Sequence, residues 1–179
     1  MQGVQLDEKT SERMKAIRTF TLMDDTFMTQ VFAGDADCTQ ELLRIILKRQ
    51  DLTVTKSVTQ LTIGNLYGRS VRLDIYANDA AGKQYDIEVQ QEDKGARPER
   101  ARLNSALFDS RLTTAGESYA ELPETYIIFI TANDVLKDGL PVYTIERTIQ
   151  ETGKLFGDRA HIVYVNGAYR GEDEVGQLM

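Results

Sequence analysis

The acidic residues between Val71 and Gln90 are the part of the sequence whose types and spacing could do chemistry. Apolar and polar residues alternate on both sides of a turn-forming cluster at 78–83, so the segment predicts two antiparallel strands. If the turn centres near Ala81, Asp74 lies opposite Glu88. Two carboxylates facing each other at about 5 Å repel unless a positive charge lies between them. Oxygen ligands at that spacing suit a hard divalent cation such as magnesium, which needs only one or two carboxylates plus water.

The alternation gives this hairpin an apolar face and a polar face. We predict that Val71, Leu73, Ile75 and Ala77 share the core face, which Tyr85, Ile87 and Val89 continue on the returning strand. The polar face carries Arg72, Asp74, Tyr76, Asn78, Gln84, Asp86, Glu88 and Gln90. Acidic residues on the solvent face of a hairpin are common, so periodicity alone favours an exposed, structural pair. Asp86 is interpreted as a surface acid.

The helices and strands that must position the hairpin are predicted from hydrophobic periodicity and from the residues that begin or end such elements. Asp37 and Gln40 resemble a capping box ahead of an amphipathic helix, and Pro98 suits the first turn of another. The apolar run at 125–131 indicates a buried central strand. We predict a peripheral arm or weak helix at 7–18 and helices at 25–32, 38–48, 98–114 and 147–156. Further strands are predicted at 52–63, 125–131, 142–146 and 161–165. This order predicts an α/β or α+β fold, a mixed central sheet flanked by helices.

Length and composition narrow the class of protein. The 179 residues, 41% hydrophobic and 27% charged, predict a single domain over 1–179, with 1–22 as a peripheral N-terminal arm. The charged start without an apolar signal core, and the absence of an apolar run long enough to span a bilayer, predict a cytoplasmic protein without a membrane partner. A net charge of −7 argues against broad adhesion to nucleic acid, although a local basic groove is compatible with it.

A known family carries a similar motif. Arg72-Leu73-Asp74-Ile75 followed by Asp86-Ile87-Glu88-Val89-Gln90 resembles the signature of the PD-(D/E)XK nuclease superfamily. In particular, the sequence resembles the branch of PD-(D/E)XK nuclease family transposases, akin to the Rpn recombination-promoting nucleases. The resemblance extends through 98–102, 122–131 and 161–167 and covers most of the chain from about Met23 onward. It implies a restriction-endonuclease-like core.

The resemblance also implies a metal site. In it Asp74 and Glu88 bind Mg²⁺, for which Mn²⁺ could substitute, and the backbone carbonyl of Val89 is a further ligand. The third signature position, usually lysine, is Gln90 here. A lysine ammonium can offset the negative charge of the transition state, whereas an amide can only hydrogen-bond, so Gln90 would position the attacking water. In this superfamily an acid on the first helix sometimes completes the site, which makes Glu41 an accessory candidate; a solvated helix glutamate is the alternative.

Basic residues follow the motif directly. Between Lys94 and Arg111 basic side chains outnumber acidic ones, and the resemblance places this helix beside the active site. We therefore predict Arg100 as a phosphate contact, with Arg97 and Arg102 as further nucleic-acid-binding residues. A solvated helix with charge pairs four residues apart is the alternative.

Other candidate chemistry is weaker. Cys38 is the only cysteine, which excludes an internal disulfide and a multi-thiolate zinc site. No third member or oxyanion motif accompanies Cys38 and His161, so we reject a cysteine nucleophile with a histidine base.

The expected function is a metal-dependent DNA endonuclease from a transposase or recombination-promoting family. The alternative is a catalytically weak or inactive relative that uses the same fold to bind nucleic acid or protein. Cutting both strands of a duplex ordinarily calls for two active sites, which makes a homodimer an alternative to a monomer. Relatives in this branch generally continue past Met179 with further helical sequence, so the resemblance implies a shortened C-terminus here.

Overall fold

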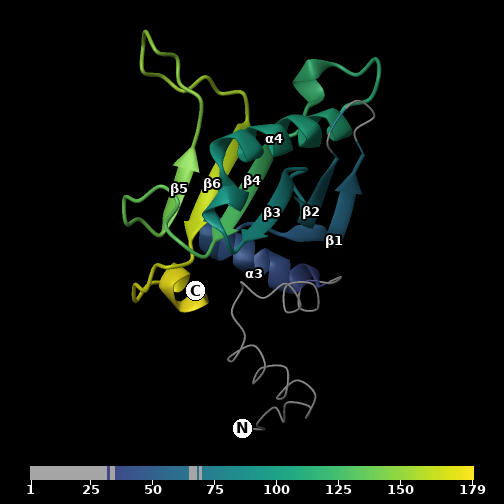
Figure 1. Cartoon of the computed structure of the whole chain (residues 1–179). Helices are drawn as coiled ribbons and strands as arrows, with labels where there is room; N and C mark the ends of the chain where they lie inside the picture. The colour runs from purple at the N-terminus through teal and green to yellow at the C-terminus, as the bar shows by residue number, and fades with distance from the viewer. Residues whose placement is uncertain (1–31, 33–34, 65–67, 69) are drawn as a thin grey trace, which may run out of the picture.

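A mixed sheet of six strands lies at the centre of the part of the chain that the computed structural model describes, residues 32, 35–64, 68 and 70–179 (Figure 1). The strand order is β1-β2-β3-β4-β6-β5. Strands β3, β4 and β6 run parallel, whereas β1, β2 and β5 pair antiparallel with their neighbours. The strands are β1 Val54–Ile63, β2 Val71–Asp79, β3 Gln84–Gln90, β4 Thr125–Thr131, β5 Val142–Ile145 and β6 Ala160–Asn166. The predicted fold class, a mixed sheet flanked by helices, is confirmed.

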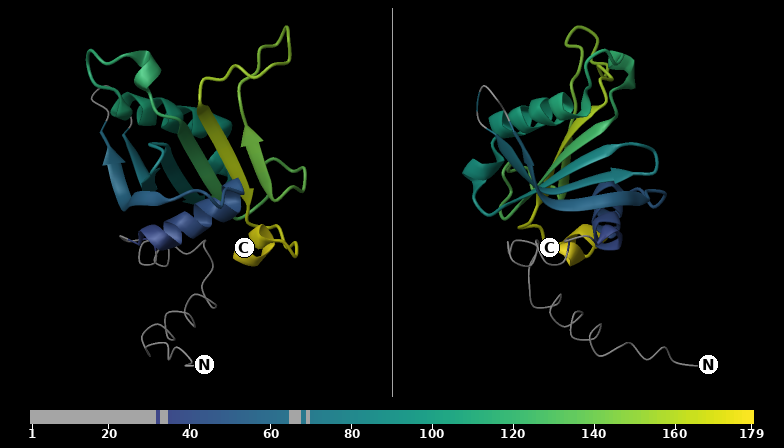
Figure 2. Two further views of the ribbon diagram at one scale, coloured as in Figure 1. Left: turned by 180° about the vertical axis from the view of Figure 1, so that it is seen from behind. Right: turned by 90° about the vertical axis from the view of Figure 1, so that its right-hand side faces the viewer.

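Two helices cover opposite faces of the sheet (Figures 1 and 2). Helix α3, Ala36–Leu47, packs in one apolar cluster with β3 and the inner strands, while α4, Pro98–Leu112, packs in a second cluster on the other face. A parallel pair needs a crossover connection, and α4 is the crossover between β3 and β4. The shorter elements are η1 Asp93–Ala96, η2 Tyr119–Glu121 and α5 Glu174–Leu178. No helix in the described residues is long and apolar enough to cross a bilayer.

Helix α3 begins earlier than the sequence predicts. Its N-cap is Asp35, whose carboxylate accepts hydrogen bonds from the backbone N–H groups of Asp37 and Cys38. The predicted capping box is therefore wrong: the side chain of Gln40 instead accepts a hydrogen bond from the Val54 N–H at the start of β1, 3.0 Å away. This contact ties α3 to the sheet.

The register of the predicted hairpin is confirmed. Ile75 pairs with Ile87 and Ala77 with Tyr85, the register that places Asp74 opposite Glu88. The prediction of one continuous apolar face is wrong. Val71 and Leu73 pack in the cluster with α4, whereas Ile75 and Ala77 pack in the cluster with α3, so β2 changes faces at Asp74.

A local irregularity in the neighbouring strand accompanies this change of face. Gln60 lies between Thr59 and Leu61, the partners of Ile75 and Leu73, and its φ of 59° is left-handed. A second irregularity, a register shift, lies between Val54 and Lys56. Non-glycine residues adopt positive φ rarely, mostly where the surrounding structure fixes them. Strand β1 is therefore bent beside the point where the Asp74 side chain leaves the sheet.

Some predicted elements differ in the structure or lie outside it. The predicted helix at 147–156 is wrong: Thr148 bridges to Leu155 in an antiparallel turn, in which Gly153 adopts φ 68° and the apolar side chains of Leu155 and Phe156 are exposed. The short helix α5 has no counterpart among the predictions. The predicted arm or weak helix at 7–18, the predicted helix at 25–32 and the arm at 1–22 lie outside the described residues apart from Phe32.

Candidate metal and nucleic-acid site

Asp74 and Glu88 lie next to each other where β2 and β3 begin to separate. The carboxylate of Asp74 accepts a hydrogen bond from the backbone N–H of Val89, with 2.9 Å between Oδ2 and N. The side chain of Glu88 is fully buried under α4. Burial and the charge of Asp74 raise the pKa of Glu88 to about 7, while Arg100 opposes the rise. The structure therefore brings the two predicted metal ligands together.

Asp86 is a buried acid beside this pair, so its interpretation as a surface acid is wrong. Its side chain has no exposed surface, because α4 covers the face of β3 that periodicity alone assigned to solvent. The nearest amide is that of Asn104 on α4, with 3.5 Å between Nδ2 and Oδ2. Burial and the charges of Glu88 and Asp74 raise the pKa of Asp86 well above its usual value. A proton on Asp86 relieves the repulsion among the three carboxyl groups.

Glu88, Gln90 and Arg100 form a closed ring of hydrogen bonds. Arg100 donates to Glu88 Oε2 at 2.8 Å and to Gln90 Oε1 at 2.9 Å, and Gln90 donates to the same Glu88 oxygen at 3.3 Å. Gln90, the third position of the sequence motif, is therefore held between the buried carboxylate and the guanidinium. Gly95 in η1 lies close to this ring, because a Cβ added there would collide with Gln90 Oε1.

The donor set fits a hard divalent cation. Glu88 Oε1 is buried and has no hydrogen-bond partner among the described residues, although Oε2 is fully used. A buried carboxylate oxygen of this kind needs a proton or a cation. No group of three or more histidine, cysteine or acidic side chains that could hold a metal lies in the described part of the chain. A metal would therefore take Asp74 and Glu88 and complete its shell with water or substrate phosphate, as magnesium commonly does.

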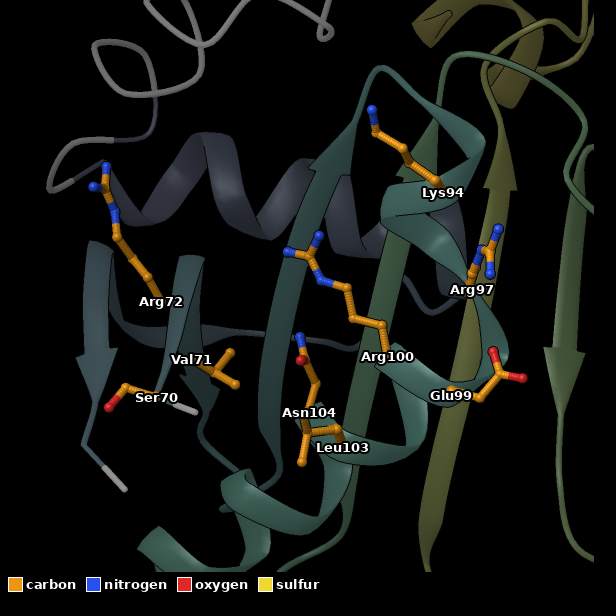
Figure 3. A pocket seen from close by; sticks show the side chains of 9 residues that line it. All are labelled: Ser70, Val71, Arg72, Lys94, Arg97, Glu99, Arg100, Leu103 and Asn104. Carbon is orange, nitrogen blue, oxygen red and sulfur yellow. The ribbon is translucent and has the colours of Figure 1, made fainter. Parts of the chain in front are cut away.

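A cleft of about 570 Å³ is lined by Arg100 and Asn104, the α4 side chains that contact Glu88 and Asp86, whereas Asp74, Asp86 and Glu88 themselves do not line it (Figure 3). Ser70, Val71 and Arg72 line it from the β2 side, and α4 lines the other side, from which Arg100 points toward the strands. Four of its lining side chains are cationic and one is acidic: Arg72, Lys94, Arg97, Arg100 and Glu99. The protein is acidic overall, with a net charge of −7, so this concentration of positive charge is local. A polyanion is the ligand that such a cleft fits.

The structure does not bring all the predicted site residues together. Glu41 is exposed on α3, the helix that covers the other face of the sheet, and its carboxylate lies 4.0 Å from Arg44. Arg102 is exposed on α4 and does not line the cleft, whereas Arg97 and Arg100 do. Val89 pairs with Ile130 of β4, with its backbone N–H on Asp74 and its side chain in the core.

Sequence reasoning favoured the surface over a place beside the metal ligands for Asp86, and it assigned no site role to Asn104 and Arg72. Asp86 lies on the same predicted face as Glu88, and this shared face indicated that the two residues are neighbours. The sequence did not indicate that a helix covers that face. Asn104 follows Arg100 by one helical turn and therefore points to the same side of α4. Arg72 lies two positions before Asp74. It lines the cleft because α4 lies across from it, and the sequence does not indicate that arrangement.

Comparison with known proteins agrees with this arrangement. The mixed six-stranded sheet, with acidic residues paired on neighbouring strands under a helix, is of the α/β class and consistent with a PD-(D/E)XK nuclease-like fold. Residues 25–167 match the family described as PD-(D/E)XK nuclease family transposase, and the chain belongs to this family. Nucleases of this kind generally depend on a divalent metal, and the family indicates DNA as the substrate. No curated protein matched the chain.

The buried position of Asp86 predicts an unusual pH dependence of stability. In the unfolded chain Asp86 has its ordinary pKa, whereas burial raises the pKa of the folded state well above it, so the free energy of unfolding falls as the pH rises above the ordinary value. Asp86→Asn removes this loss. In the presence of a chelator we expect the variant to be more stable than the parent at pH 8. The gain should shrink toward pH 4.

Urea unfolding at several pH values measures both curves. Asp138→Asn is a suitable control, because Asp138 is an exposed carboxylate in the loop before β5. A variant less stable than the parent at pH 8 would contradict the assigned protonation of Asp86.

Proposed function

We propose that this protein is a metal-dependent DNA endonuclease that hydrolyses phosphodiester bonds during recombination or transposition. The observation that carries the proposal is the pairing of Asp74 with the buried Glu88, whose Oε1 has no partner among the described residues and whose Oε2 accepts from Arg100, a residue that lines a cationic cleft. A binding module has no need for two opposed carboxylates, because their repulsion costs stability unless a cation is bound.

Each residue of the site has a distinct role in this proposal. Asp74 and Glu88 hold the metal, with the carbonyl of Val89 as a further ligand. A metal held by these residues would supply a water molecule of lowered pKa and would shield charge on the phosphate. Gln90 orients the attacking water, and Arg97 and Arg100 contact phosphate oxygens. The water oxygen bonds to phosphorus, one P–O ester bond breaks, and a proton is transferred to the leaving oxygen, which leaves a phosphomonoester and a hydroxyl.

The proposal also covers the metal, the compartment and the oligomeric state. We propose Mg²⁺ as the metal, with Mn²⁺ as a substitute, because two carboxylates are a donor set that Mg²⁺ commonly completes with water. The cytoplasm is the proposed compartment, and a homodimer the proposed form for cutting both strands of a duplex.

Nicking of supercoiled plasmid by the purified protein tests the activity. We expect conversion to open circles in Mg²⁺ or Mn²⁺, none in EDTA, and recovery when metal is added back in excess. Calorimetry with Mn²⁺ on the same preparation should show binding. Plasmid that stays supercoiled with a folded protein that binds Mn²⁺ would contradict the endonuclease and favour the second candidate below.

The second candidate is a catalytically weak or inactive relative that binds nucleic acid or protein. One observation favours it: Arg100 already neutralises Glu88, and an amide stands where the signature has lysine. On this alternative, short DNA duplexes would bind equally well in EDTA and in Ca²⁺. On the endonuclease proposal, Ca²⁺ should tighten binding, because the metal joins the phosphate to the two carboxylates.

A further inference from the structure

We infer that Arg100 supplies the positive charge that the motif lysine would supply, and that Gln90 is the residue that positions it. The inference rests on the proposed nuclease function and deepens it. It changes the expected role of Gln90, from holding the water to holding the guanidinium that acts on the reacting phosphate.

The contacts of Gln90 carry the first step. Its Oε1 accepts a hydrogen bond from Arg100 at 2.9 Å, and its Nε2 donates one to Glu88 Oε2 at 3.3 Å. An amide has one acceptor and one donor group, and both are used inside the site. The side chain that replaces lysine is therefore already committed to a cation on the neighbouring helix.

The guanidinium is placed to do more than neutralise Glu88. Its side chain is 39% exposed, whereas the Glu88 side chain is 0% exposed, and Arg100 lines the cleft. Arg100 has five N–H donors in a planar fork, and two of its nitrogens make the contacts with Glu88 and Gln90. Donors therefore remain for a phosphate oxygen in the cleft.

Arg100 and a metal do not compete for the same oxygen. The guanidinium uses Glu88 Oε2, and Oε1 is the atom without a partner among the described residues. One carboxylate can thus join the metal to the guanidinium. A phosphate bound at the metal would lie next to this fixed positive charge. Negative charge builds up on the phosphate oxygens as the phosphorus becomes five-coordinate, and a preorganised positive charge beside them lowers the barrier.

The test removes the positive charge from α4 and introduces one on β3, at the third position of the motif. Arg100→Gln removes it, and the double variant Gln90→Lys with Arg100→Gln restores it at the motif position. A second double variant, Gln90→Met with Arg100→Gln, has a side chain of similar length without charge. Each is compared with the parent by the single-turnover rate of plasmid nicking, Mn²⁺ affinity by calorimetry, DNA affinity in Ca²⁺ and the melting temperature. Lys154→Gln is the charge-loss control, since Lys154 lies in the loop that leads into Ala160, at the opposite end of the parallel strands from Gln90.

We expect Arg100→Gln to lower the single-turnover rate about 10²-fold, the usual effect of removing one transition-state donor. Mn²⁺ affinity should change far less. The lysine double variant should recover at least about tenfold of the lost rate, the methionine double variant none, and Lys154→Gln should match the parent. All rates are measured below the melting temperatures, so that a loss of folded protein does not contribute to the change in rate.

The outcomes separate the two proposals. A parent protein that nicks DNA, together with a lysine double variant no faster than Arg100→Gln alone, overturns the role of Arg100. A fall in Mn²⁺ affinity as large as the fall in rate also overturns it, because Arg100 would then act only by holding Glu88. A folded parent that binds Mn²⁺ and nicks nothing overturns the endonuclease and this inference together.

Discussion

Asp74→Asn and Glu88→Gln are each expected to lower the metal-dependent nicking rate by more than about 10³-fold. Removal of a single transition-state donor already costs about 10² to 10³ in rate, and the loss of a metal ligand removes both the activated water and the charge on the phosphate. Mn²⁺ affinity should fall in parallel. The isosteric amides keep the side-chain shape, so the packing under α4 is preserved.

Stability measurements separate loss of chemistry from loss of fold. Glu88 is buried with its pKa raised to about 7, so Glu88→Gln should leave the free energy of unfolding at pH 8 unchanged or higher. Glu151→Gln, an exposed carboxylate in the 147–158 turn, is the matched control and should nick plasmid at the parental rate. Nicking that survives both substitutions would identify the activity as a contaminant.

Phe108→Ala is expected to destabilise the protein by about 3–5 kcal/mol, the usual cost of removing a buried aromatic side chain. Phe108 is completely buried on α4 and contacts Tyr76 of β2 edge to face, with 6.0 Å between ring centroids. It is therefore one of the residues that hold α4, and with it Arg100, against the hairpin. Urea unfolding measures the effect, and Leu155→Ala, at a side chain that is 60% exposed, should stay within about 0.5 kcal/mol of the parent. A cost below about 1 kcal/mol for Phe108→Ala would show that α4 is held mainly elsewhere.

The hairpin register could be predicted from sequence because it is a local property. A turn-forming cluster fixes which residues face each other, and the pairing of Ile75 with Ile87 follows from its position. The apolar run of β4 was equally clear, since a strand buried on both faces is continuously hydrophobic.

The burial of Asp86 and the ring around Glu88 could not be predicted in the same way. Both depend on α4, which comes later in the chain and covers a face that the alternation of β3 assigns to water. Periodicity gives the two sides of a strand, but whether the polar side is solvated or covered is decided by tertiary packing. The same limit applies to Gln90: its type suggested a weakened nuclease, whereas its contact with Arg100 was visible only in three dimensions.

The bend in β1 has a consequence for how the protein behaves at high concentration. β1 lies at one edge of the sheet, where a row of backbone N–H and C=O groups could recruit the edge of another molecule and start an aggregate. The left-handed Gln60 and the register shift near Val54 interrupt that row, and Lys56 places a charge along it. A foreign strand can match only part of this edge. The irregularity beside Asp74 therefore also protects the fold against edge-to-edge polymerisation.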